Sequence, residues 1–150
     1  MVDVIRVVGR FGEEELTEDS YYYCLGKERL DRGDVKEALR LFRISLYLRE
    51  HFKTLSQISV CYDRLGMADL ALEYSGLAYR ANPRNNKTAY LFAEQLVRND
   101  RLAEAREILQ FISTVDPSYK KARLLLEDLD GTDRRGAGRG SHGGRRRHRA

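Results

Sequence analysis

Apolar residues recur three and four positions apart along most of the chain, which is the spacing of one buried face of an α-helix. The stripe is clearest from Val35 to Leu46 and from Leu102 to Ile112. The pattern predicts six helices in three consecutive pairs. The first helices of the pairs span 20–32, 54–65 and 87–98, and the second helices span 35–49, 68–81 and 102–114.

Small and rigid residues recur at a nearly constant interval through these pairs. Ala71 and Ala105 are thirty-four residues apart, as are Pro83 and Pro117, and Ala38 lies thirty-three residues before Ala71. A constant interval of this length indicates one supersecondary unit repeated along the chain. The three units span about 19–52, 52–85 and 86–119.

Within a unit, particular residue types follow one another in a fixed order. The second unit carries a tyrosine, a turn glycine, a close-contact alanine, a small residue and a closing proline, namely Tyr62, Gly66, Ala71, Ala78 and Pro83. This order resembles the tetratricopeptide repeat. The resemblance implies an all-α solenoid of three helix-turn-helix repeats over 19–130, closed by a capping helix at 118–129. A three-hairpin helical bundle with accidental periodicity is the alternative.

The turns inside the pairs carry their own signals. We expect Gly33 and Gly66 to adopt a left-handed backbone where two antiparallel helices turn back. Asp34, three residues before Glu37, is predicted to cap the second helix of the first unit. Asp100 stands where the third unit would have its turn glycine, and it is predicted to cap the helix at 102–114.

The two ends of the chain lie outside the repeats. The net charge of +4 comes from the C-terminal end, because residues 131–150 hold seven arginines and one acid, whereas residues 1–130 carry 20 basic and 22 acidic side chains. We expect 131–150 to be a disordered Arg/Gly-rich tail with weak, nonspecific affinity for nucleic acid. Residues 1–18 are predicted to be a lead-in segment, in which 1–12 is either extended or frayed. An acidic patch at the start of the first helix is expected to comprise Glu13, Glu14, Glu15, Glu18 and Asp19. We hypothesise that the apolar stretch 1–12 docks in the groove of its own repeat array.

Candidate catalytic and metal-binding groups are few. His51 is the one histidine within the repeats, and it falls in a predicted loop. Cys24 and Cys61 have no histidine beside them and no metal-ligand spacing, so they are expected to be reduced thiols of a cytoplasmic protein. No apolar run is long enough to cross a membrane. The sequence therefore predicts a noncatalytic protein without a metal or cofactor.

The resemblance also implies that the first helices line a concave groove. The groove positions expected to bind a partner are Tyr23, Lys27, Lys53, Ser56, Val60, Asp63, Lys87, Tyr90, Glu94 and Arg98. Family members that hold C-terminal carboxylates of chaperones use fixed groove positions, which here carry Tyr23, Lys27, Gln57, Lys87 and Leu91. Because Lys87 alone keeps the family residue, a chaperone tail is not the expected partner.

These features favour a protein–protein interaction adaptor that binds a peptide or a partner helix in the groove. Two other functions fit the sequence less well. One is a chaperone of the type III secretion kind for a translocator protein, and the other is association with RNA or an anionic surface through the Arg/Gly tail. The exposed end faces of so short an array also allow a homodimer by stacking.

Overall fold

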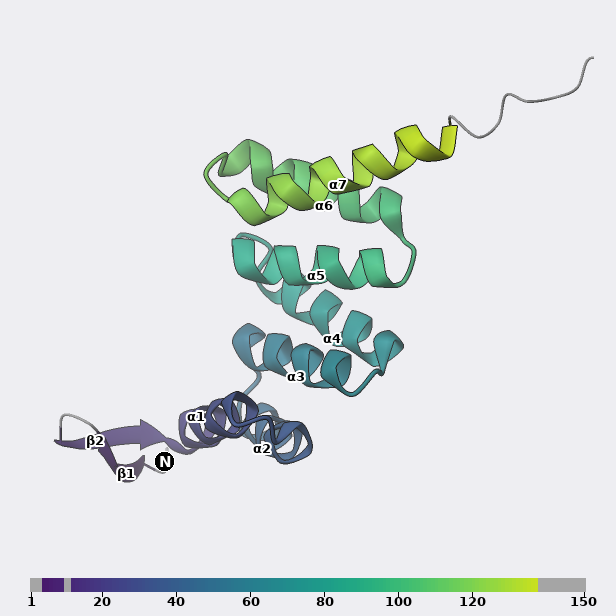
Figure 1. Cartoon of the computed structure of the whole chain (residues 1–150). Helices are drawn as coiled ribbons and strands as arrows, with labels where there is room; N and C mark the ends of the chain where they lie inside the picture. The colour runs from purple at the N-terminus through teal and green to yellow at the C-terminus, as the bar shows by residue number, and fades with distance from the viewer. Residues whose placement is uncertain (1–3, 10–11, 138–150) are drawn as a thin grey trace, which may run out of the picture.

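Seven helices follow a short β-hairpin in the computed structural model, which describes residues 4–9 and 12–137 (Figure 1). The helices are stacked in layers, and the hairpin projects from the first layer (Figure 1). The elements are β1 (Val4–Gly9), β2 (Gly12–Thr17), α1 (Glu18–Asp31), α2 (Val35–Leu48), α3 (Phe52–Arg64), α4 (Ala68–Ala81), α5 (Asn86–Arg98), α6 (Leu102–Val115) and α7 (Lys120–Ala137).

The helices pack in sequential pairs. α1 lies against α2, α3 against α4 and α5 against α6, and each pair contacts the next through α2 with α3 and α4 with α5. α7 packs on α6 and covers the last pair. The predicted all-α solenoid of three repeats with a capping helix is therefore confirmed. None of the described helices is long and apolar enough to span a lipid bilayer.

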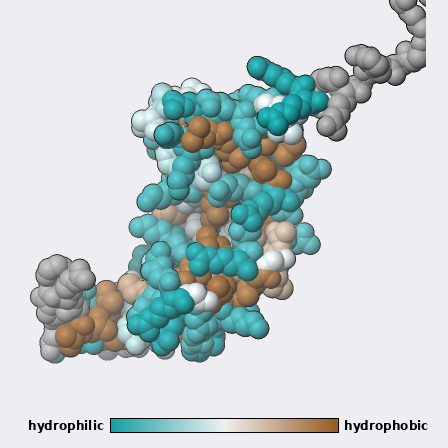
Figure 2. Space-filling view, in the orientation of Figure 1, coloured by the Kyte–Doolittle hydropathy of each residue, from teal (hydrophilic) through white to brown (hydrophobic). Residues whose placement is uncertain are grey.

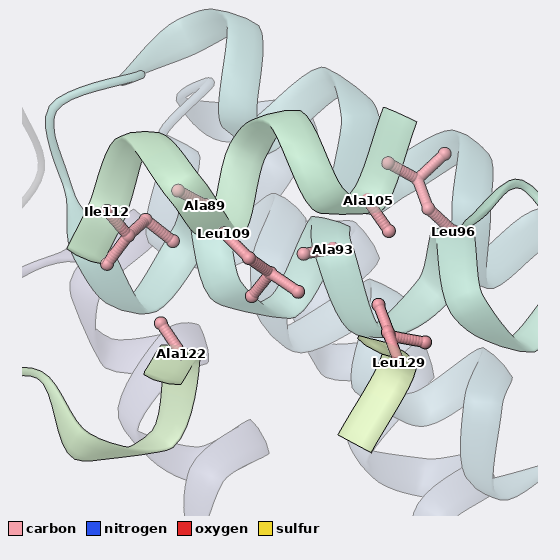
Figure 3. Close-up of a cluster of buried hydrophobic side chains, with 8 residues drawn as sticks. All are labelled: Ala89, Ala93, Leu96, Ala105, Leu109, Ile112, Ala122 and Leu129. Atoms are coloured by element: carbon pink, nitrogen blue, oxygen red, sulfur yellow. The ribbon is translucent and has the colours of Figure 1, made fainter. Parts of the chain in front are cut away.

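Alanines allow the helices of a pair to approach closely. Ala38, Ala71 and Ala105 have no exposed surface, and each lies in the second helix of its repeat. In the second repeat the hydroxyl of Ser59 donates a hydrogen bond of 2.7 Å to the carbonyl of Ala71, which satisfies a buried polar group at the helix contact. The last repeat shares its core with the cap, since Ala122 and other α7 residues pack among buried side chains of α5 and α6 (Figure 3).

The turns inside the pairs share one backbone conformation. Gly33 and Gly66 have φ angles of 84° and 75°, as predicted, and Asp100 has a φ of 59°. The predicted cap by Asp100 is wrong, because this residue occupies the left-handed turn position and the residue before α6 is Arg101, which makes no side-chain cap. Aspartate tolerates this conformation better than most residues with a side chain. The cap by Asp34 is confirmed, since its carboxylate accepts a hydrogen bond of 3.3 Å from the backbone of Glu37.

The N-terminal segment forms an antiparallel β-hairpin. Ile5 lies opposite Leu16 and Val7 opposite Glu14, so the backbone groups that an isolated strand would leave unpaired are bonded between β1 and β2. The hypothesis that this stretch docks in the groove is wrong for residues 4–9, because the hairpin contacts α1 and points away from the stack (Figure 1). Of the predicted acidic patch, Glu13, Glu14 and Glu15 belong to β2, whereas Glu18 and Asp19 lie in the first turn of α1 as expected. Residues 1–3, 10 and 11 lie outside the described part.

The capping helix is longer than predicted. It begins at Lys120 and ends at Ala137, eight residues beyond the predicted end. Arg106 of α6 explains the extension, because its guanidinium donates to the carbonyl of Leu129 at 3.2 Å and pairs with the carboxylates of Asp130 and Asp133. The predicted boundary of the tail therefore falls inside α7. Residues 138–150 lie outside the described part of the chain.

Candidate functional site

A groove of about 1170 Å³ runs along one face of the stack. α1, α3 and α5 line it, as predicted for the first helices of the repeats, and α7 adds a further wall. α5 and α7 lie in front of α4 and α6 in Figure 1, and on this face hydrophobic residues gather along the middle with hydrophilic residues on both sides (Figure 2). The groove brings together eight of the ten predicted positions: Tyr23, Lys27, Lys53, Ser56, Val60, Lys87, Tyr90 and Glu94.

The other two predicted positions lie outside the groove lining and bind one another. A guanidinium nitrogen of Arg98 lies 2.9 Å from a carboxylate oxygen of Asp63, which joins α5 to α3. This pair links the second and third repeats. Its charges are mutually neutralised, so neither side chain offers a free charge to a ligand.

The tyrosines of the groove are half-buried and neutral. Burial, together with the negative charge of the nearby Glu94 carboxylate, raises the pKa of Tyr90 to about 12. Burial also raises the pKa of Tyr23, although a hydrogen bond with Gln57 opposes the shift. The Tyr90 ring centroid lies 6.0 Å from that of Tyr119, which begins the far wall. Such rings present flat apolar surface with a polar edge, a combination frequent in protein interfaces.

Lysines are concentrated at this site. The chain has six lysines, and five of them line the groove: Lys27, Lys53, Lys87, Lys120 and Lys121. The ion pairs found among the described residues are all made by arginines, and none involves a lysine. The lysine charges of the groove are therefore not neutralised by a neighbouring side chain of the described structure.

Reasoning from the sequence missed the wall that α7 provides. Tyr119, Lys120, Lys121, Leu124 and Leu125 all line the groove, and the side chain of Leu124 is 50% exposed there. The helix was expected only to cover the last hairpin. A signal was available, because an apolar residue two positions after the buried Ala122 points to a different side of the helix.

The side chains that could act as nucleophiles, bases or metal ligands do not converge on this groove. His51 is an exposed loop residue, as expected, and its ring accepts a hydrogen bond of 3.1 Å from the backbone of Lys53, so it also caps α3. Cys24 is exposed on α1, whereas Cys61 is buried and burial raises its pKa to about 11. Among residues 4–9 and 12–137, no group of three or more His, Cys, Asp or Glu side chains could hold a metal. The arrangement can hold a chain segment by apolar contact and by charge.

No family model matches the sequence, and no curated protein matches it either. Solved structures, in contrast, share its fold. The TPR domain of Sgt2 from Aspergillus fumigatus has a TM-score of 0.73 at 17% identity, over 88% of this chain and 89% of that one. The first TPR of Spaghetti (RPAP3), bound to the HSP90 peptide SRMEEVD, has a TM-score of 0.72 at 16% identity, over 77% of this chain and 92% of that one.

A third structure resembles the chain to a similar degree. The Yersinia enterocolitica type III secretion chaperone SycD, in complex with a peptide of the translocator YopD, has a TM-score of 0.69 at 17% identity, over 76% of this chain and 93% of that one. Identities this low establish similarity of fold and not of partner. Three stacked helical hairpins and a capping helix thus give this chain the tetratricopeptide-repeat fold that its sequence resemblance predicted.

Proposed function

We propose that this protein is a noncatalytic adaptor that binds a peptide or a partner helix in the groove between the first helices and α7. The observation that carries the proposal is the groove itself, which combines half-buried tyrosines with lysines that no described side chain neutralises. Two structural neighbours contain a bound peptide, SRMEEVD in one and a YopD segment in the other. Tetratricopeptide-repeat domains are typically noncatalytic, and solenoids of this kind use their concave surface for binding.

The size of the groove suits a segment of a protein better than a small molecule. Its volume of about 1170 Å³ exceeds the roughly 300–1,000 Å³ that is usual for small-molecule sites. It is open along the stack, so a ligand can cross several repeats and contact each in turn. The unpaired Cys24 and Cys61 are compatible with the reducing cytoplasm, where we propose that the adaptor works.

Selection from a library of random peptides tests this function. Binders are selected on the wild-type protein and then measured by fluorescence polarisation against Tyr23→Ala/Tyr90→Ala and against Lys87→Ala. We expect at least a tenfold loss of affinity for the tyrosine variant, since aromatic anchors dominate interface energies. Tyr47→Ala is the matched control, because Tyr47 is 91% exposed on α2 and outside the groove.

The ring centroids of Tyr23 and the buried Phe42 are 5.7 Å apart, so loss of the Tyr23 ring could also destabilise the fold. The melting temperature of each variant is therefore recorded. The proposal fails if the groove variants fold and still bind the selected peptides with wild-type affinity. It also fails if the selection yields no binder. The chaperone-like function, the tail-driven function and the stacked homodimer stay predictions, because no contact of the described residues favours any of them.

A further inference from the structure

We propose that the groove accepts an acidic protein segment, which is held by its side-chain carboxylates along the length of the stack, with α7 as one wall of the site. This inference rests on the proposed function and specifies its ligand. The occupant would be a stretch of chain with recurring Asp or Glu residues between apolar ones. It would need neither a free C-terminus nor a particular terminal motif.

The distribution of cations supports an acidic ligand. The chain has 21 arginines and six lysines, yet among the residues that the structure describes the groove is lined by five lysines and by no arginine. Two acids, Glu94 and Asp128, also line it, so the lysines outnumber the acids. Glu94 lies close enough to Tyr90 to raise the pKa of its phenol. The local charge is therefore positive, although residues 1–130 as a whole have slightly more acids than bases.

The positions of the lysines indicate an extended contact. Lys27 lies on α1, Lys53 on α3 and Lys87 on α5, while the remaining two lie on α7. The lysines thus follow the stack from its first helix to its last. Packed helices lie about 8–10 Å apart, and an extended chain advances about 3.3 Å per residue. Carboxylates distributed along the ligand would meet successive lysines, whereas a single terminal carboxylate would meet one or two.

The lysine side chain suits the recognition of carboxylates along an extended ligand. A lysine ammonium is a compact charge on a flexible stem and does not impose the two-point geometry of an arginine guanidinium. A row of lysines therefore tolerates variation in the spacing of acids along a ligand.

The apolar lining of the groove favours a protein segment over a nucleic acid. Val60, Leu91, Leu124 and Leu125 line the groove together with the tyrosines. Aliphatic side chains bury the apolar side chains of a peptide, but they contribute little to base stacking, which relies on aromatic and guanidinium planes. A segment that alternates acidic and apolar residues would pair with the lysines and also bury its apolar side chains against this lining.

A designed peptide tests the inference directly. The probe is a fluorescein-labelled, twelve-residue peptide with glutamate at every third position between leucines and alanines, amidated at its C-terminus. We expect it to bind within about twofold of its free-carboxylate form, and we expect the peptide with glutamine for glutamate to bind at least tenfold more weakly. Lys120→Gln/Lys121→Gln should lower the affinity for the acidic peptide by about threefold to tenfold, the range for two exposed charge pairs. Lys36→Gln is the matched control, because Lys36 is exposed on α2 and lies outside the groove.

Several outcomes would overturn the inference. Binding restricted to the free-carboxylate peptide would indicate that the groove recognises a C-terminal carboxylate. Equal binding of the glutamine peptide would show that the side-chain carboxylates do not contribute to affinity. A twelve-nucleotide single-stranded RNA that displaces the peptide as well as unlabelled peptide does would make the site a general anion groove. Neutral or basic peptides from the random library that depend on Tyr90 would leave the adaptor function standing and refute the acidic ligand alone. Failure of every peptide, designed or selected, would refute both.

Discussion

Gly26 and Phe42 pack so closely that a methyl group on Gly26 would lie 2.8 Å from two carbons of the Phe42 ring. Gly26 lies in the middle of α1, where a glycine costs about 1 kcal/mol relative to alanine. The cost is offset by the approach of α1 to α2, because the ring of Phe42 has no exposed surface and fills the core of the first repeat. The first repeat therefore depends on the absence of a side chain at this one position.

Gly26→Ala should lower the free energy of unfolding by about 1–2 kcal/mol, because overpacking of the core outweighs the gain in helix propensity. Denaturant unfolding monitored by circular dichroism measures the change. Gly131→Ala is the matched control, since Gly131 also lies in a helix but has nothing within 4 Å of its added methyl group. That control should raise stability by about 0.5–1 kcal/mol. Equal effects of the two substitutions would contradict the packing of α1 on α2.

The two cysteines should differ in reactivity. Cys61 is fully buried, and burial raises the pKa of its thiol to about 11, so little thiolate forms and no reagent reaches it. Cys24 is exposed on α1. A maleimide should therefore label one thiol rapidly in the native protein and the second only after denaturation. Cys24→Ser should abolish the rapid labelling, and a native protein that reacts at both thiols with similar rates would contradict the buried position of Cys61.

Stability should fall in alkaline solution as the groove tyrosines titrate. The pKa of Tyr90 is raised from its ordinary value near 10 to about 12, so both folded and unfolded chains keep this proton below pH 10. Between pH 10 and pH 12 the unfolded chain loses the proton first, which favours unfolding. Tyr90→Phe should make the fall in unfolding free energy over this interval shallower. Denaturant titrations at several pH values measure it, with Tyr47→Phe as the exposed control.

An unchanged pH dependence in Tyr90→Phe would contradict the burial of this phenol beside the charge of Glu94. Tyr23 and Tyr119 also have raised pKa values through burial. Part of the alkaline fall should therefore persist in the variant. Complete loss of the fall would assign the whole effect to Tyr90, a result that the three half-buried phenols do not predict.

The repeats can be predicted from the sequence because their geometry depends on the spacing of residues that are close along the chain. The apolar stripes and the alanines at 38, 71 and 105 repeat with the period of the fold, so helix pairs and inward positions follow from counting. The same counting places Asp63 and Arg98 in the groove. The structure pairs them with one another, because a charge with a partner one helix away is more favourable than an unpaired one.

The features that were missed depend on contacts distant in sequence or on choices that local rules leave open. An aspartate at position 100 is compatible with a helix cap and with a turn. It adopts the left-handed turn conformation, because the chain must reverse there and the third repeat has no glycine at this position. The pairing of β1 with β2 joins a strand of apolar residues to one that contains Glu14 and Glu15, so neither strand shows a strong alternation by itself. The groove wall on α7 depends on how the cap sits on α6, which no spacing within α7 specifies.

The second half of α7 should depend on Arg106. This guanidinium on α6 bonds the carbonyl of Leu129 and pairs with Asp130 and Asp133, while its own side chain is 24% exposed. Arg106→Ala should remove protection from hydrogen exchange over 130–137 and lower the unfolding free energy by about 1 kcal/mol, because the two acids are largely exposed and their ion pairs are screened. Arg123→Ala is the matched control, since its pair with Glu127 lies within α7 and does not tie it to α6. Protection of 130–137 that survives Arg106→Ala would mean that α7 holds its full length without this anchor, and that its extension beyond Leu129 has another cause.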